Sequence, residues 1–160
     1  MRVGIGYDIH RLVRGRPLIL GGVRVVSPVG SLGHSDGDAV LHALTDAVLG
    51  AAALGDIGDH FPDQDKAHRG RDSADFIRRA LALAARKGLV PVNADIVVIA
   101  ERPKLSAYKS RIRARVAALM GLPVSRVGLQ AKTHEGLGEL GSGRAIAAQA
   151  AVLLKERKKR

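Results

Sequence analysis

Asp8, His10 and His42 are the residues whose types and spacing best suit a metal site. Asp8 and His10 lie two apart in residues 2–10, which alternate as a β-strand does, so their side chains leave the same face of the strand. Ile9, between them, is expected to point into the core. His42 would add a second imidazole, and two histidines with one carboxylate leave a tetrahedral zinc ion the open position that catalysis requires.

Asp38 and Asp46 lie four residues on either side of His42, on the same face of a predicted helix. Their carboxylates are suited to accept the ring N–H protons of metal-bound histidines. The alternative is a solvated helix face that carries an ordinary buried histidine. An Asp-x-His pair is common by chance, so the spacing alone does not decide between these two interpretations.

Three further segments carry residues suited to phosphates, sugars or hard metal ions. His34 and Ser35 precede a predicted helix, whose free N–H groups would attract phosphate, although Ser35 would serve equally as a plain helix cap. The aspartates of the irregular segment 55–71 could accept bonds from sugar hydroxyls or could simply form turns. Residues 132–135, Lys-Thr-His-Glu, suit phosphate together with Mg²⁺, and a surface loop would look similar.

The formal net charge of +11 points to an anionic partner. Much of this charge lies in residues 155–160, which are expected to form a solvated basic tail. Aromatic residues make up only 2% of the chain, so platforms for stacking bases are scarce, and anionic small molecules are favoured over nucleic acid. The core must be built from small aliphatic residues, and a subunit interface would supply additional burial.

Cysteine is absent from the chain, which excludes disulfides, thiolate metal sites and cysteine nucleophiles. Any metal must therefore rest on histidine and carboxylate ligands. No apolar run approaches the ~20 residues of a membrane span, and the first residues do not form a signal peptide. A cytoplasmic location without a membrane partner is the expectation.

Hydrophobic periodicity predicts a mixture of strands and helices. The segment 145–154 is ambiguous, because its alanine content favours helix while its apolar residues also alternate as in a one-sided strand. We expect one α+β domain over residues 1–160, a two-layer sandwich with a mixed β-sheet and helices on one face. The predicted strands are 2–10, 94–100 and 127–132, with a Gly-Gly hairpin at 18–26. The predicted helices are 36–53, 72–87 and 105–120, and Ser35 or Asp36 is expected to cap the first of them.

Several strings of the sequence together resemble the 2-C-methyl-D-erythritol 2,4-cyclodiphosphate synthase family. The most specific are H-S-D-G-D-x-x-x-H-A-L-T-D at 34–46 and G-D-I-G-x-x-F-P-D at 55–63. Tyr7-Asp8-Ile9-His10 and Pro103-Lys104 extend the resemblance along nearly the whole chain. It implies a phosphorus–oxygen lyase of non-mevalonate isoprenoid synthesis, which converts 4-diphosphocytidyl-2-C-methyl-D-erythritol 2-phosphate into the cyclodiphosphate and CMP. It also implies a homotrimer with active sites between adjacent subunits, in which the last segment of the chain is a strand.

The resemblance also implies a metal arrangement and roles for individual residues. Zinc, or another divalent cation, would be held by Asp8, His10 and His42, and Mg²⁺ or Mn²⁺ by Glu135. The substrate's own 2-phosphate is then the nucleophile, so the protein must fold the substrate and neutralise its charge without an activated side chain. His34 and Thr133 would stabilise the transition state.

The residues implied in substrate binding fall into three groups. Backbone groups of the cytidine pocket would read the cytosine edge, so the side chains of Glu101 and Arg102 are expected to vary freely. The methylerythritol group is Asp56, Ile57, Gly58, Phe61, Pro62, Asp63, Gln64 and Asp65; the cytidine group is Ala100, Glu101, Arg102, Pro103, Lys104, Leu105 and Ser106; the remaining contacts are Asp8, Ile9, His10, His34, Ser35, Lys132, Thr133, His134, Glu135, Glu139 and Ser142.

The chain departs from well-known members of the family after Glu135. It has Glu139, Ser142 and Arg144 where those members carry an aromatic residue, an arginine and a glutamate. In some members a cavity on the trimer axis binds an isoprenoid diphosphate, and the matching positions here are Tyr7, Glu139, Ser142 and Gln149. Such a cavity would repel a diphosphate unless Arg144 turns inward to pair with Glu139.

Two other functions compete with this interpretation. A two-metal phosphoesterase would direct a metal-bound water at phosphorus and release free phosphate. A basic nucleic-acid-binding module would use the arginines of residues 111–115 and the C-terminal tail against phosphates, with a steep dependence on salt.

Overall fold

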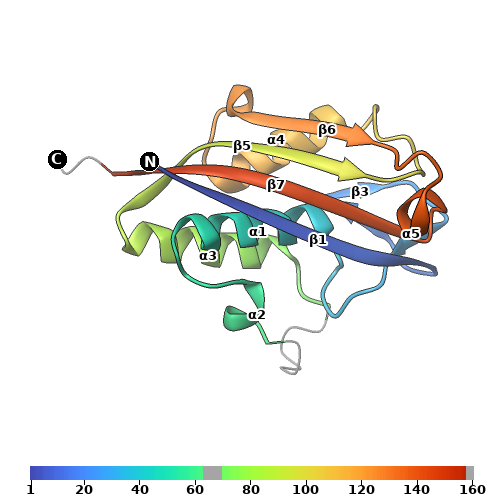
Figure 1. Ribbon diagram of the computed structural model, residues 1–160, viewed down its shortest axis with the longest axis horizontal. Coiled ribbons are helices and arrows are strands. Elements are labelled where there is room, and N and C mark those ends of the chain that lie inside the picture. Colours follow the sequence, from blue (N-terminus) through green and yellow to red (C-terminus); the bar gives the residue numbers. More distant parts are fainter. Residues whose placement is uncertain (63–69, 158–160) are drawn as a thin grey trace.

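A five-stranded sheet forms one layer of the molecule (Figure 1). The structure is a computed structural model and describes residues 1–62 and 70–157. Only β5 and β6 pair in parallel, so the sheet is mixed as predicted. In spatial order its strands are β4 (Val29–Ser31), β1 (Arg2–Arg14), β7 (Ala145–Glu156), β5 (Leu89–Ile99) and β6 (Val127–Lys132).

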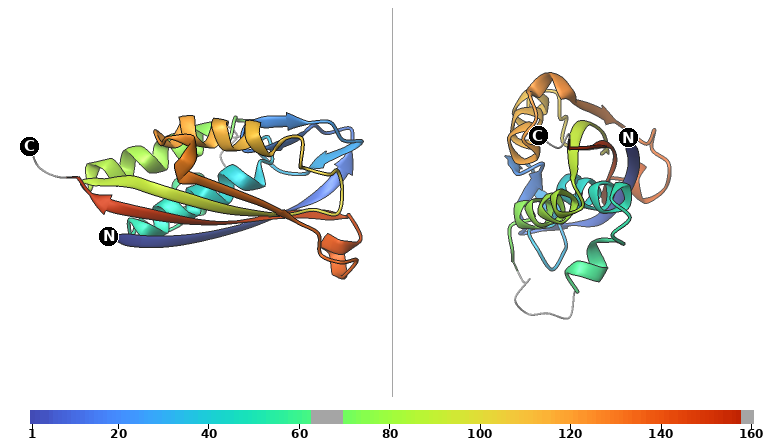
Figure 2. Two further views of the ribbon diagram at one scale, coloured as in Figure 1. Left: turned by 90° about the horizontal axis from the view of Figure 1, so that it is seen from above. Right: turned by 90° about the vertical axis from the view of Figure 1, so that its left-hand side faces the viewer.

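The long helices α1 (Ala39–Ala51), α3 (Ala74–Arg86) and α4 (Lys109–Met120) all cover the same face of the sheet (Figure 2). The core lies between these two layers and is built from alanine, valine, leucine and isoleucine. The predicted α+β class with helices on one face is therefore confirmed. The short elements are α2 (Ile57–His60), α5 (Gly138–Gly141) and a 3₁₀ turn at Val124–Arg126. Among the described residues, no helix has both the length and the apolarity to cross a membrane.

A separate hairpin joins β2 (Leu18–Leu20) to β3 (Val23–Val25). Its turn is Gly21-Gly22, as predicted, and both glycines have positive φ angles of 59° and 72°. A two-residue turn with two positive φ angles matches the twist of the paired strands and favours glycine at both positions.

Two glycines of β1 let α1 approach the sheet closely. A Cβ atom built on Gly6 would lie 2.0 Å from the carbonyl oxygen of Ala43, and one on Gly4 would lie 1.9 Å from that of Ala47. Side chains at these two positions would push the helix away from the strand. The glycines thus allow α1 to bring His42 over the residues of β1.

β7 is the central strand of the sheet, between β1 and β5. Its alternating residues Ala148, Ala150, Val152 and Leu154 are buried under the helices, so the strand expected from the family resemblance is confirmed against helix propensity. The basic tail begins later than expected, because Lys155 and Glu156 belong to β7. Residues 158–160 lie outside the described part of the chain.

Several boundaries differ from the predictions. α1 begins at Ala39 and is capped by Asp38, whose carboxylate accepts from the N–H groups of Val40 and Leu41, so neither Ser35 nor Asp36 is the cap. α2 interrupts the segment expected to be irregular, and β5 starts at residue 89 instead of 94. Ile9 is 47% exposed on the face of the sheet opposite the three long helices, so the expectation that it enters the core was wrong.

Candidate metal and substrate site

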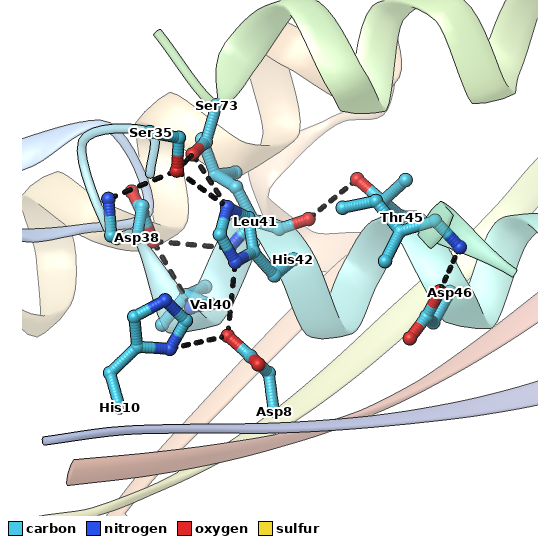
Figure 3. A network of polar contacts seen from close by, with 12 residues as sticks. Asp8, His10, Ser35, Asp38, Val40, Leu41, His42, Thr45, Asp46 and Ser73 are labelled. Atoms are coloured by element: carbon cyan, nitrogen blue, oxygen red, sulfur yellow. Dashed lines mark hydrogen bonds and ion pairs between the residues drawn. The ribbon is translucent and has the colours of Figure 1, made fainter. Parts of the chain in front are cut away.

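Asp8, His10 and His42 meet where α1 crosses β1 (Figure 3). Nδ1 of His10 lies 2.9 Å from Oδ2 of Asp8, and Nδ1 of His42 lies 3.1 Å from the same oxygen. One ligand atom from each residue lies within 4.8 Å of the other two. The predicted trio therefore forms a compact cluster at the base of a cleft.

The chemistry of this cluster fits a divalent cation. Nδ1 of His10 is buried and has no hydrogen-bond partner of acceptable geometry among the described residues, so its lone pair is available. Burial acts to raise the pKa of Asp8, but the two adjacent imidazoles of His10 and His42 outweigh it and hold this pKa at about 2. An ionised carboxylate and two imidazoles form a ligand set that suits zinc and similar ions.

The far side of the His42 ring faces hydroxyl groups. Its Nε2 lies 2.9 Å from Oγ of Ser73 and 3.1 Å from Oγ of Ser35. Ser73 in turn donates a short hydrogen bond to Oδ1 of Asp36, and its backbone N–H donates to Oδ2 of the same residue at 3.1 Å. Sequence reasoning missed Ser73, whose signal would have been a serine at the start of the predicted helix 72–87.

The predicted roles of Asp38 and Asp46 beside the histidines were wrong. Asp38 is fully buried, and its carboxylate accepts from four backbone N–H groups, those of Gly21 and Gly22 in the hairpin and of Val40 and Leu41 in α1. Asp46 accepts from the N–H of Ile57 at 2.8 Å. Both aspartates therefore join segments of backbone instead of orienting imidazole rings.

The segment 33–35 forms one wall of the cleft. The side chain of His34 is exposed, while Nη2 of Arg16 donates to the carbonyl oxygens of Gly33 and Ser35 on either side of it. The N–H of Gly70 donates to the carbonyl oxygen of His34 at 2.7 Å. This peptide is held by its backbone, which leaves the His34 imidazole free to face a ligand. Sequence reasoning had not singled out Arg16.

The opposite wall contains several residues predicted to contact methylerythritol. Ile57, Gly58 and Phe61 line the cleft, together with Phe76 of α3, which sequence reasoning did not consider. The rings of Phe61 and Phe76 lie 4.6 Å apart and make this wall apolar. Asp56 caps α2 by accepting from the N–H of Asp59. Pro62 ends the described segment, and Asp63, Gln64 and Asp65 lie outside it.

A second cleft lies at the carboxyl ends of the parallel strands β5 and β6. It contains most of the predicted cytidine group, except that Arg102 lines a neighbouring hollow with Ser142. Glu101 was expected to vary freely, but in this chain its side chain has a structural contact, because its carboxylate accepts from the N–H of His134 at 2.7 Å. The residues that line the second cleft are Ala100, Glu101, Pro103, Lys104, Leu105, Ser106, Lys109, Ala131, Lys132 and Thr133.

The two clefts lie near opposite edges of the sheet. Asp8 is on β1, whereas Lys132 ends β6, and β7 and β5 lie between them. Three steps between neighbouring strands amount to ~14 Å. Glu135 follows β6 and accepts from Oγ1 of Thr133 at 2.5 Å. One chain therefore does not bring Glu135 to the Asp8 cluster.

Glu139 and Arg144 form an exposed ion pair with two contacts, at 2.7 and 2.8 Å. The hydrogen bond from Arg144 lowers the pKa of Glu139. Ser142 donates to the backbone carbonyl oxygen of Glu139. The pairing of Arg144 with Glu139, which was expected to reduce the repulsion of a diphosphate, is thus present.

Comparison with known proteins places this geometry in a family. The model of the YgbB family matches residues 1–155. The chain is 52% identical to 2-C-methyl-D-erythritol 2,4-cyclodiphosphate synthase of Symbiobacterium thermophilum, over 96% of this chain and 98% of that protein. A CDP-bound structure of such a synthase superposes with a TM-score of 0.89 at 47% identity, covering 96% of this chain and 100% of that one. The IspF–CDP complex of Plasmodium falciparum gives a TM-score of 0.85 at 37% identity, covering 98% and 97%. The chain belongs to the YgbB family.

Proposed function

We propose that this chain converts 4-diphosphocytidyl-2-C-methyl-D-erythritol 2-phosphate into 2-C-methyl-D-erythritol 2,4-cyclodiphosphate and CMP, as a lyase of non-mevalonate isoprenoid synthesis. The observation that carries the proposal is the cluster of Asp8, His10 and His42 in its cleft. Relatives more than 50% identical to this chain, which are named as this synthase, support it independently. A cytoplasmic location stays a prediction.

The assignment of individual ions is part of the proposal. Asp8, His10 and His42 would hold zinc, and Glu135 would hold Mg²⁺ or Mn²⁺, since a carboxylate suits a hard cation. Bound cations would neutralise the diphosphate and make its phosphorus a better electrophile. No side chain has to act as a nucleophile, because the 2-phosphate of the substrate attacks the β-phosphorus and CMP leaves.

The remaining residues would bind and orient the substrate. The exposed His34 ring stands beside the cleft, on a peptide held by Arg16, and would contact the phosphates. Thr133 and Lys132 would contact the diphosphate from the cytidine side. Phe61 and Phe76 would exclude water from one wall, which strengthens the electrostatic interactions inside the cleft.

A homotrimer with active sites between subunits is also proposed. The face of the sheet opposite the three long helices exposes Val3, Ile5, Tyr7 and Ile9 in one stripe along β1, at 67, 65, 52 and 47%. A stripe of large apolar side chains on a sheet is a typical subunit interface. Association through this face would bring the cytidine cleft of one subunit to the metal cluster of the next, which one chain cannot do with its own two clefts ~14 Å apart.

Product analysis tests the proposed reaction. The protein is incubated with the cytidyl substrate and Mg²⁺, and the products are separated and followed by ³¹P NMR. CMP and a cyclic diphosphate are expected in equal amounts. Asp8→Asn should abolish both products, whereas Asp75→Asn, the same change at an exposed carboxylate of α3, should leave them unchanged. Free phosphate without a cyclic product would indicate a phosphoesterase and overturn the proposal.

A further inference from the structure

We propose that Asp36 and Ser73 position His42 as a metal ligand, by holding the proton on its Nε2 so that Nδ1 is presented to the cation beside Asp8. The inference rests on the proposed metal site and assigns a role to two residues outside the ligand set. These residues lie on the loop before α1 and at the start of α3.

Counting protons gives the direction of each hydrogen bond. The carboxylate of Asp36 is an acceptor, so the single hydroxyl proton of Ser73 points to it. Oγ of Ser73 can then meet Nε2 of His42, 2.9 Å away, only as an acceptor. Nε2 must therefore carry a proton. Since a neutral imidazole has one proton, the lone pair is left on Nδ1, the atom 3.1 Å from Oδ2 of Asp8.

The conformation of Ser73 supports a role outside its own helix. Ser73 occupies the position before α3 where a serine hydroxyl usually accepts from the first N–H groups and stabilises the helix. Its hydroxyl makes no such bond, and Asp72 accepts from the N–H of Ala74 instead. Ser73 is completely buried, so its hydroxyl is committed to the contacts with His42 and Asp36.

Ser35 completes the surroundings of Nε2 but does not replace Ser73. Its Oγ lies 3.1 Å from Nε2, accepts from the N–H of Gly37 at 3.1 Å and lies 3.4 Å from Oγ of Ser73. Ser35 makes no hydrogen bond to a carboxylate among the described residues, whereas the proton of Ser73 is directed by Asp36. We therefore infer that the Asp36–Ser73 pair fixes the direction of the hydrogen bonds that reach Nε2 of His42.

Zinc affinity measured against a chromophoric chelator tests the proposal without substrate. Ser73→Ala should weaken zinc binding by about 10- to 100-fold, the range typical for removal of a partner of a ligating histidine. Ser73→Thr, which keeps the hydroxyl, should restore most of the affinity. Ser31→Ala is the matched control, because Ser31 is buried near the cluster and its hydroxyl has no partner among the described residues. It should bind zinc as the unmodified chain does.

Two further measurements separate positioning from a general loss of stability. Long-range ¹H–¹⁵N NMR of the zinc-loaded chain should show the proton of His42 on Nε2. In a double-mutant cycle, Asp36→Ala added to Ser73→Ala should cause little further loss of affinity, because both residues act through one chain of hydrogen bonds. Asp36→Ala alone serves the test if Ser73→Ala does not fold.

Three outcomes would overturn the inference. They are unchanged zinc affinity in folded Ser73→Ala, strictly additive losses in the cycle, and a proton on Nδ1 of zinc-loaded His42. Zinc binding that follows the expected pattern in a chain that forms no cyclic diphosphate would support the inference and contradict the proposed reaction. Normal turnover with unchanged zinc affinity in Ser73→Ala would contradict the inference and support the proposed reaction.

Discussion

Gly6→Ala should damage both the fold and the metal cluster, although it adds only one methyl group. The new Cβ would lie 2.0 Å from the carbonyl oxygen of Ala43, where ordinary non-bonded contacts are ~3.5 Å. The obstacle is helix backbone and cannot rotate away, so α1 must retreat from β1 by about 1.5 Å. Overpacking of this kind costs about 3 kcal/mol, the upper part of its usual range.

The same displacement should weaken metal binding. Ala43 follows His42 in α1, so a retreating helix carries the imidazole away from Asp8 and His10. Metal–ligand distances tolerate deviations of only about 0.2 Å. We therefore expect Gly6→Ala to lose zinc affinity by at least about tenfold, even under conditions where the variant remains folded.

Gly50→Ala is the matched control, and it should change the free energy of unfolding in the opposite direction. Gly50 is in the same helix, is exposed, and a Cβ built on it meets no atom within 4 Å. Alanine there should stabilise the fold by about 0.5–1 kcal/mol, because glycine is the poorer helix former. Urea unfolding at one fixed protein concentration measures both changes. A Gly6→Ala variant within about 0.5 kcal/mol of the unmodified chain would refute the close-approach argument.

The remaining predictions concern assembly, the second metal and the axial surface. Ile5→Lys should give a monomer by light scattering and lose turnover. Val26→Lys is the control and should change neither, because Val26 is 82% exposed but lies outside the apolar stripe of β1. An active monomer would contradict the intersubunit site. Glu135→Gln should keep its zinc content but require more Mg²⁺ or Mn²⁺ for turnover, and identical titration curves would remove the role of Glu135. Calorimetry should detect no binding of geranyl diphosphate tighter than about micromolar, ~8 kcal/mol, because Arg144 and Glu139 neutralise each other and position 142 carries a serine instead of an arginine that could hold the diphosphate; tighter binding would show that the axial cavity recognises diphosphates.

Local sequence was sufficient for those features whose cause is local. Asp8 and His10 share a face because alternate residues of a strand do, and the hairpin follows from Gly21-Gly22 because two positive φ angles favour glycine. The strand nature of β7 was not local. Its alanine content favours helix, and strand was inferred only through the family resemblance.

Tertiary structure decided which polar groups meet across segments. Asp38 has the right spacing to serve His42, but its carboxylate is taken by N–H groups of a hairpin distant in sequence, which spacing within one helix cannot reveal. Ser73 serves His42 instead, because α3 packs beside α1 and carries the residue that precedes its first turn to the ring. Ile9 was expected in the core, yet only the placement of the three long helices on one face shows which side of the strand is buried. Hydrogen-bond partners and buried faces depend on three-dimensional neighbours, and the periodicity of a single segment records only that two faces differ.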